Sequence, residues 1–252
     1  MKEIKKQTDT NRKRLIHLKD ISYAYPGGML VLNHMDLEFF RGDRLGLVAP
    51  NGSGKTTVFH IIMGLLKPLS GYIELFGSEK KEEKDFVDVR KRIGLLFQDS
   101  DDQLFCPTVL EDVAFGPLNL GKSREEALDI SKKTLEFLGI SEFENRITFK
   151  LSGGEKRLVA LATILSMEPE ILLLDEPTTG LDEKTRAILT KIIQETDISY
   201  MLISHNADFL YECTDNIFTI KDGRVINQGK MYRHSHDHIH TPSFLPDHGH
   251  GH

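Results

Sequence analysis

Short apolar runs alternate with helical patterns and glycine-containing turns between residues 15 and 229. Three of the runs show no polar alternation, which is typical of strands that are buried on both faces of a sheet. These runs cover residues 45–49, 171–174 and 200–203. Because the strands alternate with helical segments, the pattern predicts an α/β domain.

The first run leads into a glycine-rich loop and then into an apolar helix. The loop reads Pro50-Asn51-Gly52-Ser53-Gly54-Lys55-Thr56-Thr57, and the helix is predicted to run through Val58, Ile61, Ile62 and Leu65. In such a strand–loop–helix unit the backbone N–H groups converge on phosphate oxygens. The pattern predicts that the Lys55 ammonium reaches the β- and γ-phosphates of ATP, and that the Thr56 hydroxyl binds Mg²⁺.

Ala49 stands where a phosphate-binding loop of this kind usually begins with glycine. Alanine accepts a negative φ, but a left-handed backbone strains it. If the loop keeps its usual path, the methyl group costs ~1 kcal/mol or less. The sequence leaves two interpretations open, a normal loop and a loop with weakened nucleotide binding.

Polar side chains follow the other two buried runs. Asp175 and Glu176 end the second run, and Ser204-His205 ends the third. An acid at such a strand end can hold Mg²⁺ beside the loop threonine, which is the role predicted for Asp175. Glu176 is predicted to orient or deprotonate the attacking water. His205 is predicted to be catalytic or to contact the γ-phosphate.

A second anion site is predicted at residues 151–155, which read Leu-Ser-Gly-Gly-Glu. Ser152 and Glu155 have the spacing of a capping box at the start of an amphipathic helix. The two glycines after the cap leave backbone N–H groups accessible at the positive end of that helix. A well-capped helix without a ligand is the simpler interpretation.

Together these motifs resemble the ATP-binding subunit of ABC transporters, over residues 15–229. The resemblance implies a P-loop ATPase fold with a mostly parallel core sheet, an antiparallel β subdomain and a helical subdomain. It implies that Ser152, Gly153 and Gly154 bind the γ-phosphate held by the P-loop of a second ATPase subunit. The ATP site is then complete only in a dimer, either a homodimer or a heterodimer.

The same resemblance implies roles for three further residues. Tyr25 would stack on adenine, Gln98 would contact Mg²⁺ and the transmembrane partner, and Asp182 would lie at the dimer interface. Tyr23 is a rival for the adenine position, but Pro26 ends the strand and favours a ring at its rim. Glu155 replaces the glutamine of the family's signature loop, a change that preserves the capping chemistry.

Residues 97–121 resemble the energy-coupling-factor importers, especially the cobalt and nickel uptake ATPases, which take up metals or vitamins. The resemblance implies that residues 100–150 form the helical subdomain, which grips transmembrane subunits at the cytoplasmic face of the cell membrane. A capping box at Ser123 and Glu126 predicts a helix from about Ser123 to Leu138.

The C-terminal tail, residues 230–252, is rich in histidine and is predicted to be disordered. Imidazole suits Ni²⁺ and Co²⁺, so the tail is a candidate transition-metal site. Its histidines are His234, His236, His238, His240, His248, His250 and His252. A solvated tail without a metal role is the alternative.

Composition excludes several classes of protein. The net charge of −6 does not suggest nucleic-acid binding. The chain has no apolar run long enough to cross a membrane, and residues 1–14 lack the apolar core of a secretory signal. Those residues are expected to be a flexible lead-in.

Two alternative functions fit the sequence less well. A soluble ABC ATPase of translation or DNA repair would usually carry two cassettes in one chain. A metal-storage protein would leave the ATP motifs unused.

Overall fold

We analysed a computed structural model, which describes residues 12–229. The predicted lead-in, residues 1–14, lies outside the described residues except for its last three positions. The histidine-rich tail, residues 230–252, lies wholly outside them.

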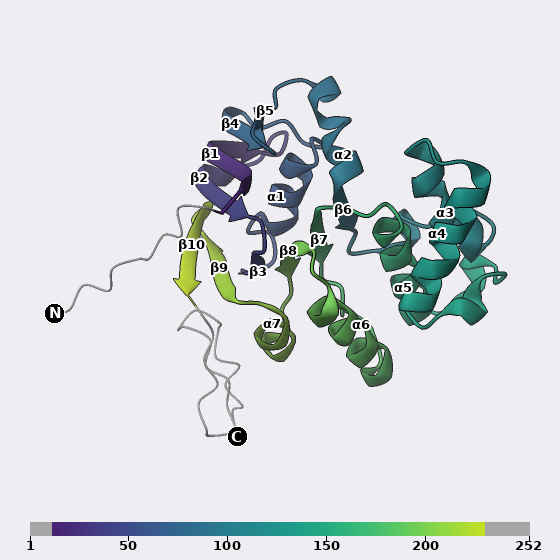
Figure 1. Cartoon of the computed structure of the whole chain (residues 1–252). Helices are drawn as coiled ribbons and strands as arrows, with labels where there is room; N and C mark the ends of the chain where they lie inside the picture. The colour runs from purple at the N-terminus through teal and green to yellow at the C-terminus, as the bar shows by residue number, and fades with distance from the viewer. Residues whose placement is uncertain (1–11, 230–252) are drawn as a thin grey trace, which may run out of the picture.

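The described part of the chain is built around a six-stranded sheet in the order β10-β9-β3-β8-β7-β6 (Figure 1). Strands β3, β6, β7, β8 and β9 are parallel, and β10 pairs antiparallel with β9. Every residue of β7 and β8 is buried, which explains their uninterrupted apolar sequences. The bounds are β3 Arg44–Val48, β6 Ile93–Leu96, β7 Ile171–Asp175, β8 Ser199–Ile203, β9 Asn216–Lys221 and β10 Arg224–Gly229.

A smaller antiparallel sheet lies beside the central one and has the order β2-β1-β4-β5. Its strands are β1 Arg14–Ala24, β2 Leu30–Phe40, β4 Ser70–Leu75 and β5 Ser78–Glu79. Buried and exposed residues alternate along most of β2, so this sheet presents one apolar face. That face and helix α1 share a hydrophobic core with β3. The predicted fold class, with a mostly parallel core sheet and an antiparallel β subdomain, is confirmed.

Helix α1, Lys55–Ile62, follows the glycine-rich loop but is shorter than predicted. Leu65 lies outside it and is half exposed. The helix ends because Gly64 takes a left-handed backbone, with φ +67°, and the N–H of Leu65 donates to the carbonyl of His60. The helical spacing of Leu65 was therefore misleading.

A helical subdomain projects from the side of β6 (Figure 1). It contains α3, Val109–Asn119, and α4, Arg124–Phe137, which pack on α5, Gly153–Leu165. The predicted capping box of Ser123 and Glu126 is present at the start of α4. Three further α-helices lie in the described chain: α2, Val89–Arg92, α6, Glu183–Glu195, and α7, Ala207–Cys213.

Between residues 12 and 229, no helix has the length and apolar character needed to span a membrane.

Candidate nucleotide site

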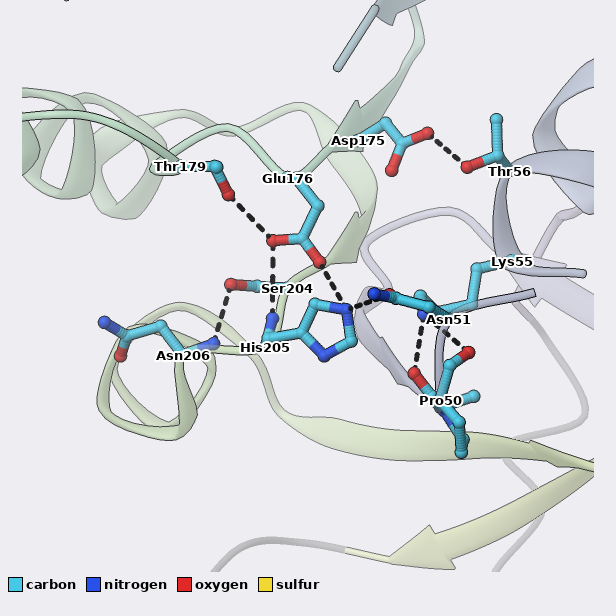
Figure 2. A network of polar contacts seen from close by, with 11 residues as sticks. Pro50, Asn51, Lys55, Thr56, Asp175, Glu176, Thr179, Ser204, His205 and Asn206 are labelled. Atoms are coloured by element: carbon cyan, nitrogen blue, oxygen red, sulfur yellow. Dashed lines mark hydrogen bonds and ion pairs between the residues drawn. The ribbon is translucent and has the colours of Figure 1, made fainter. Parts of the chain in front are cut away.

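Strand order brings the predicted catalytic segments together. β8 lies between β3 and β7, and all three strands are parallel. Their carboxyl ends therefore meet at one edge of the sheet. The glycine-rich loop, the segment from Asp175 to Thr179 and the turn at His205 lie side by side there (Figure 2).

The backbone of the glycine-rich loop has left-handed φ values at two of its glycines. Gly52 and Gly54 have φ values of +77° and +100°, which side chains rarely adopt. A Cβ on Gly54 would lie 2.8 Å from Cγ1 of Val31, so glycine is required there for space as well. Ala49 is buried and does not take a positive φ. The alanine therefore introduces no left-handed strain, which supports the interpretation of a normal loop.

Lys55, the first residue of α1, folds back over this loop. Its ammonium donates to the carbonyl oxygens of Ala49, at 2.6 Å, and Pro50, at 3.1 Å. Burial lowers the pKa of Lys55, while the nearby carboxylates of Glu176 and Asp175 raise it. The ammonium is thus held by neutral carbonyls, and a phosphate group would be a stronger, charged acceptor.

Thr56 and Asp175 join α1 to the end of β7. The Thr56 hydroxyl donates to Oδ2 of Asp175 at 2.6 Å. Burial raises the pKa of the Asp175 carboxyl. Gln98 lines the same cavity as these two residues. The donor set consists of oxygens on a carboxylate, a hydroxyl and an amide, which are ligands that suit Mg²⁺.

Glu176 has an unusual backbone and an unsatisfied side chain. Its φ is +46°, a strained value for a residue with a Cβ. Oε2 accepts from the Thr179 hydroxyl at 3.2 Å and from the backbone N–H of His205 at 3.4 Å. Oε1 lies 3.2 Å from Nε2 of His205, yet it is buried without a hydrogen bond of good geometry to any described residue. A buried carboxylate oxygen in that state is a free acceptor.

His205 connects this carboxylate to the glycine-rich loop. Its Nε2 lies 3.0 Å from Oδ1 of Asn51, which comes from the loop after β3 (Figure 2). One imidazole nitrogen therefore faces both Asn51 and Glu176. The position of His205 agrees with the prediction from the third apolar run.

These residues surround a cavity of about 500 Å³. Its lining includes most of the predicted cradle and catalytic residues: Tyr25, Asn51, Gly52, Gly54, Lys55, Thr56, Thr57, Gln98, Asp175, Glu176 and His205. Pro50 and Ser53 belong to the same loop but are not among the lining residues.

The aromatic residue at the rim of this cavity is Tyr25. Its side chain is half exposed, whereas Tyr23 is buried and packs edge-on against it. The Tyr25 hydroxyl also lies 3.1 Å from Oγ1 of Thr57. The choice of Tyr25 over Tyr23 therefore agrees with the geometry, because a buried ring cannot stack on a base.

The second predicted anion site lies apart from this cavity. Ser152, Gly153 and Asp182 are exposed and do not line it. Ser152 caps α5, and Asp182 caps α6 by accepting from the N–H of Thr185 at 3.0 Å. A Cβ on Gly154 would lie 3.3 Å from Thr185, so the two helix starts are neighbours. They form an exposed surface that includes both the Ser-Gly-Gly segment and Asp182.

Sequence reasoning missed two residues that organise the site. Thr179 holds Oε2 of Glu176, and its place three residues after the acid was the available signal. Arg157 is buried in α5, where it donates to the carbonyls of Phe97 and Gln98 at 2.5 Å. An arginine on the apolar face of the predicted helix, four residues before Leu161, could have revealed it.

The chain is similar in sequence to known proteins. A family model described as ABC transporter matches residues 32–179. The energy-coupling factor transporter ATP-binding protein EcfA of Methanothermobacter thermautotrophicus is 42% identical over 219 residues, which are 85% of this chain and 70% of that protein. EcfA of Methanocaldococcus jannaschii is 40% identical, with 85% and 78% covered.

Solved structures agree with these relatives. CbiO1 of Clostridium perfringens, described as part of the ABC transporter complex CbiONQ, superposes with a TM-score of 0.78 at 34% identity, over 86% of this chain and 89% of that one. A dimeric ATP-binding cassette bound to ADP and phosphate gives 0.79 at 25% identity, over 85% and 98%. The predicted resemblance to energy-coupling-factor ATPases is thereby confirmed, and the chain belongs to the ABC transporter family as its ATP-hydrolysing cassette.

Proposed function

We propose that this protein is the ATPase of an energy-coupling-factor importer, and that it works as a dimer with two ATP molecules between the subunits. The single observation that carries the hydrolytic role is the buried Oε1 of Glu176. It is an unsatisfied acceptor in the cavity that also contains Lys55 and Thr56. An attacking water would satisfy it.

Different residues of the cavity have different roles in ATP hydrolysis. Lys55 exchanges its carbonyl partners for the β- and γ-phosphate oxygens, and Tyr25 stacks on adenine. Thr56, Asp175 and Gln98 would hold Mg²⁺, which would neutralise the charge on the phosphate oxygens when bound. Glu176 accepts the proton of the attacking water through Oε1. His205 turns from Asn51 toward the γ-phosphate.

A second molecule is required because the Ser-Gly-Gly segment cannot contribute to its own cavity. Ser152 and Gly153 are exposed at the positive end of α5, outside the cavity of their own chain. A partner presenting its own lysine loop to this end would place the γ-phosphate between the two chains. The exposed Asp182 beside Gly154 would lie in the same interface. The TM-score of 0.79 to a dimeric cassette supports this arrangement.

An exposed apolar surface on the helical subdomain is a suitable docking site for a transmembrane subunit. Phe105 and Phe115 are exposed, and their rings meet edge-on at a centroid distance of 4.7 Å. Phe149 is 72% exposed and follows Thr148, whose N–H donates to the carbonyl of Pro107. Apolar side chains gathered in this way mark protein interaction sites. The protein would thus be peripheral at the cytoplasmic face of the membrane.

Docking can be tested by co-purification. The chain should be expressed with the membrane subunits from its own operon, as wild type, Phe105→Ser/Phe115→Ser and Phe137→Ser. Phe137 is a matched control because it is 57% exposed in a different groove, with Ile130 and Leu165. Loss of the membrane subunits from the double variant only is the expected result. Equal recovery with all three proteins would contradict this docking site.

For the transported solute we propose nickel or cobalt ions. The resemblance of residues 97–121 and the imidazole content of residues 230–252 support this choice. A vitamin or another small solute is the alternative. Between residues 12 and 229 no group of three or more His, Cys, Asp or Glu side chains is placed to hold a metal ion.

A metal role for the tail can be tested by calorimetry. Ni²⁺ is titrated into the full chain and into a chain that ends at Gly229, both without nucleotide. Micromolar binding to the full chain only is expected. Millimolar binding, or equal binding to both chains, would contradict a metal role for the tail. Metal-dependent growth of a deletion strain would then decide whether the solute is a metal.

A further inference from the structure

Glu155 places a negative charge close to the predicted trans phosphate site. It is the third residue of α5, where its Oε2 accepts from the N–H of Ser152 at 2.7 Å. The Ser152 hydroxyl accepts from the N–H of Glu155 in return. This capping box stabilises the helix start. However, the carboxylate also offsets the positive helix end that would attract a phosphate group, which a glutamine would not do.

Arg146 neutralises that carboxylate. Its two terminal nitrogens donate to Oε1 at 2.6 Å and to Oε2 at 3.3 Å, as a two-pronged ion pair. Together with the Ser152 N–H, this contact lowers the pKa of Glu155 to about 2. Glu155 is therefore ionised at neutral pH, and Arg146 supplies the compensating charge.

The turn that carries Arg146 is itself held in place. The guanidinium lies 4.6 Å from the ring centroid of Phe143, and the Arg146 N–H donates to the Phe143 carbonyl at 2.8 Å. The Arg146 carbonyl accepts from the N–H of Val109, the first residue of α3, at 3.0 Å. Arg146 thus connects the start of α3, next to the apolar docking surface, to the cap of α5.

The geometry points to Arg146 as a positioning residue for ATP-driven dimerisation. Its guanidinium cancels the charge of Glu155 and holds the capping box, so that the N–H groups of Gly153 and Gly154 can receive the γ-phosphate bound by the partner. Arg146 acts through Glu155 and need not touch the nucleotide. This inference rests on the proposed sandwich dimer.

The consequence is that Arg146 matters because residue 155 is a carboxylate. Arg146→Met removes the compensating charge, and we expect ATP-driven dimerisation to weaken by roughly five- to tenfold, the scale of a partly exposed bidentate pair. Binding of ATP to the monomer should not change, because the lysine loop lies in another part of the chain. Adding Glu155→Gln to Arg146→Met should restore dimerisation, since the amide keeps the cap without a charge.

The experiment uses the full chain with Glu176→Gln as background, to prevent turnover. Dimerisation is followed by analytical ultracentrifugation with Mg-ATP, and ATP affinity is measured at protein concentrations where the chain is monomeric. Lys133→Met is the matched control. It removes a 2.7 Å ion pair with Asp129 elsewhere in the helical subdomain and should leave dimerisation unchanged.

The outcomes separate this inference from the proposed function. If the Glu176→Gln background does not dimerise with ATP at all, the sandwich dimer itself is wrong. If it does, but Arg146→Met dimerises equally well, the role of Arg146 is wrong. Failure of Glu155→Gln to rescue the variant would instead indicate direct contact with nucleotide or a purely structural role, and would also overturn the inference.

Discussion

The hydroxyl of Thr56 donates a 2.6 Å hydrogen bond to Oδ2 of Asp175, across 119 positions of sequence. Thr56 is the second residue of α1, and Asp175 is the last residue of β7. Two of the three predicted Mg²⁺ ligands are therefore in contact, and the bond between them orients the oxygens that a metal would use. A buried carboxylate held only by a hydroxyl retains a desolvation penalty, which has measurable consequences.

The first consequence is a pH-dependent stability. Burial raises the pKa of Asp175 above its unfolded value, so the folded state binds the proton more tightly. In metal-free protein, the penalty of the ionised carboxylate is fully present above the raised folded value. It should disappear as the pH falls through the raised folded value toward the unfolded one, about 3.9.

Asp175→Asn tests this effect, because the amide carries no charge. In the presence of a chelator we expect the variant to be more stable than wild type at pH 7, because the buried amide carries no charge to desolvate, although it should lose Mg²⁺-dependent hydrolysis. Thermal unfolding at pH 7 and at lower pH measures the difference, which should shrink on acidification. A variant that is less stable than wild type at pH 7 would contradict the prediction.

Glu176→Gln should separate ATP binding from hydrolysis. The amide preserves the size of the side chain but cannot accept the proton of the attacking water, so turnover should fall by about 10²–10⁴-fold. ATP should still bind, and the protein should accumulate as a closed dimer. Steady-state hydrolysis and size-exclusion chromatography with Mg-ATP measure both effects. Glu212→Gln, an exposed substitution in α7, is the control. Near-normal hydrolysis would remove Glu176 from this role.

The shared site predicts complementation between two inactive variants. Lys55→Ala disables the loop of its own chain, and Ser152→Arg blocks the cap that serves the partner's loop. If the working pair is a homodimer, a mixture regains one complete site in each mixed dimer. Random pairing of equal amounts should restore about a quarter of wild-type hydrolysis. A mixture as inactive as its components, under conditions where wild type is a homodimer, would argue against the shared site.

Ala49→Gly should leave ATP affinity nearly unchanged. Ala49 is buried and does not take a positive φ, so the methyl group causes no strain that glycine would relieve. The substitution should instead lower the free energy of unfolding by about 0.4–1 kcal/mol, because glycine makes the unfolded chain more flexible. Calorimetric ATP titration and denaturant unfolding test the two parts. A clear gain in ATP affinity would favour a weakened loop in the natural sequence.

Several contacts of the site could be anticipated only in outline. The three apolar runs and the residues after them indicated that Lys55, Glu176 and His205 belong to one sheet edge. They did not indicate that Nε2 of His205 faces Asn51 as well as Glu176, because that contact depends on β8 lying between β3 and β7. The prediction that the helix runs through Leu65 was wrong for a local reason. Gly64, with its positive φ, ends the helix although the apolar spacing continues to Leu65.

The sequence by itself determined the features whose causes are local. Three such features are the glycine-rich turn before a helix, the acid after an apolar run and the Ser–Glu capping box. Each depends on residues that are neighbours in the sequence, so its chemistry could be predicted from the sequence. Only the tertiary structure decided which oxygen of Glu176 stays free, and that Arg146 pairs with Glu155. Those outcomes follow from strand order and from turns packed against distant helices, where long-range burial sets the position of each side chain.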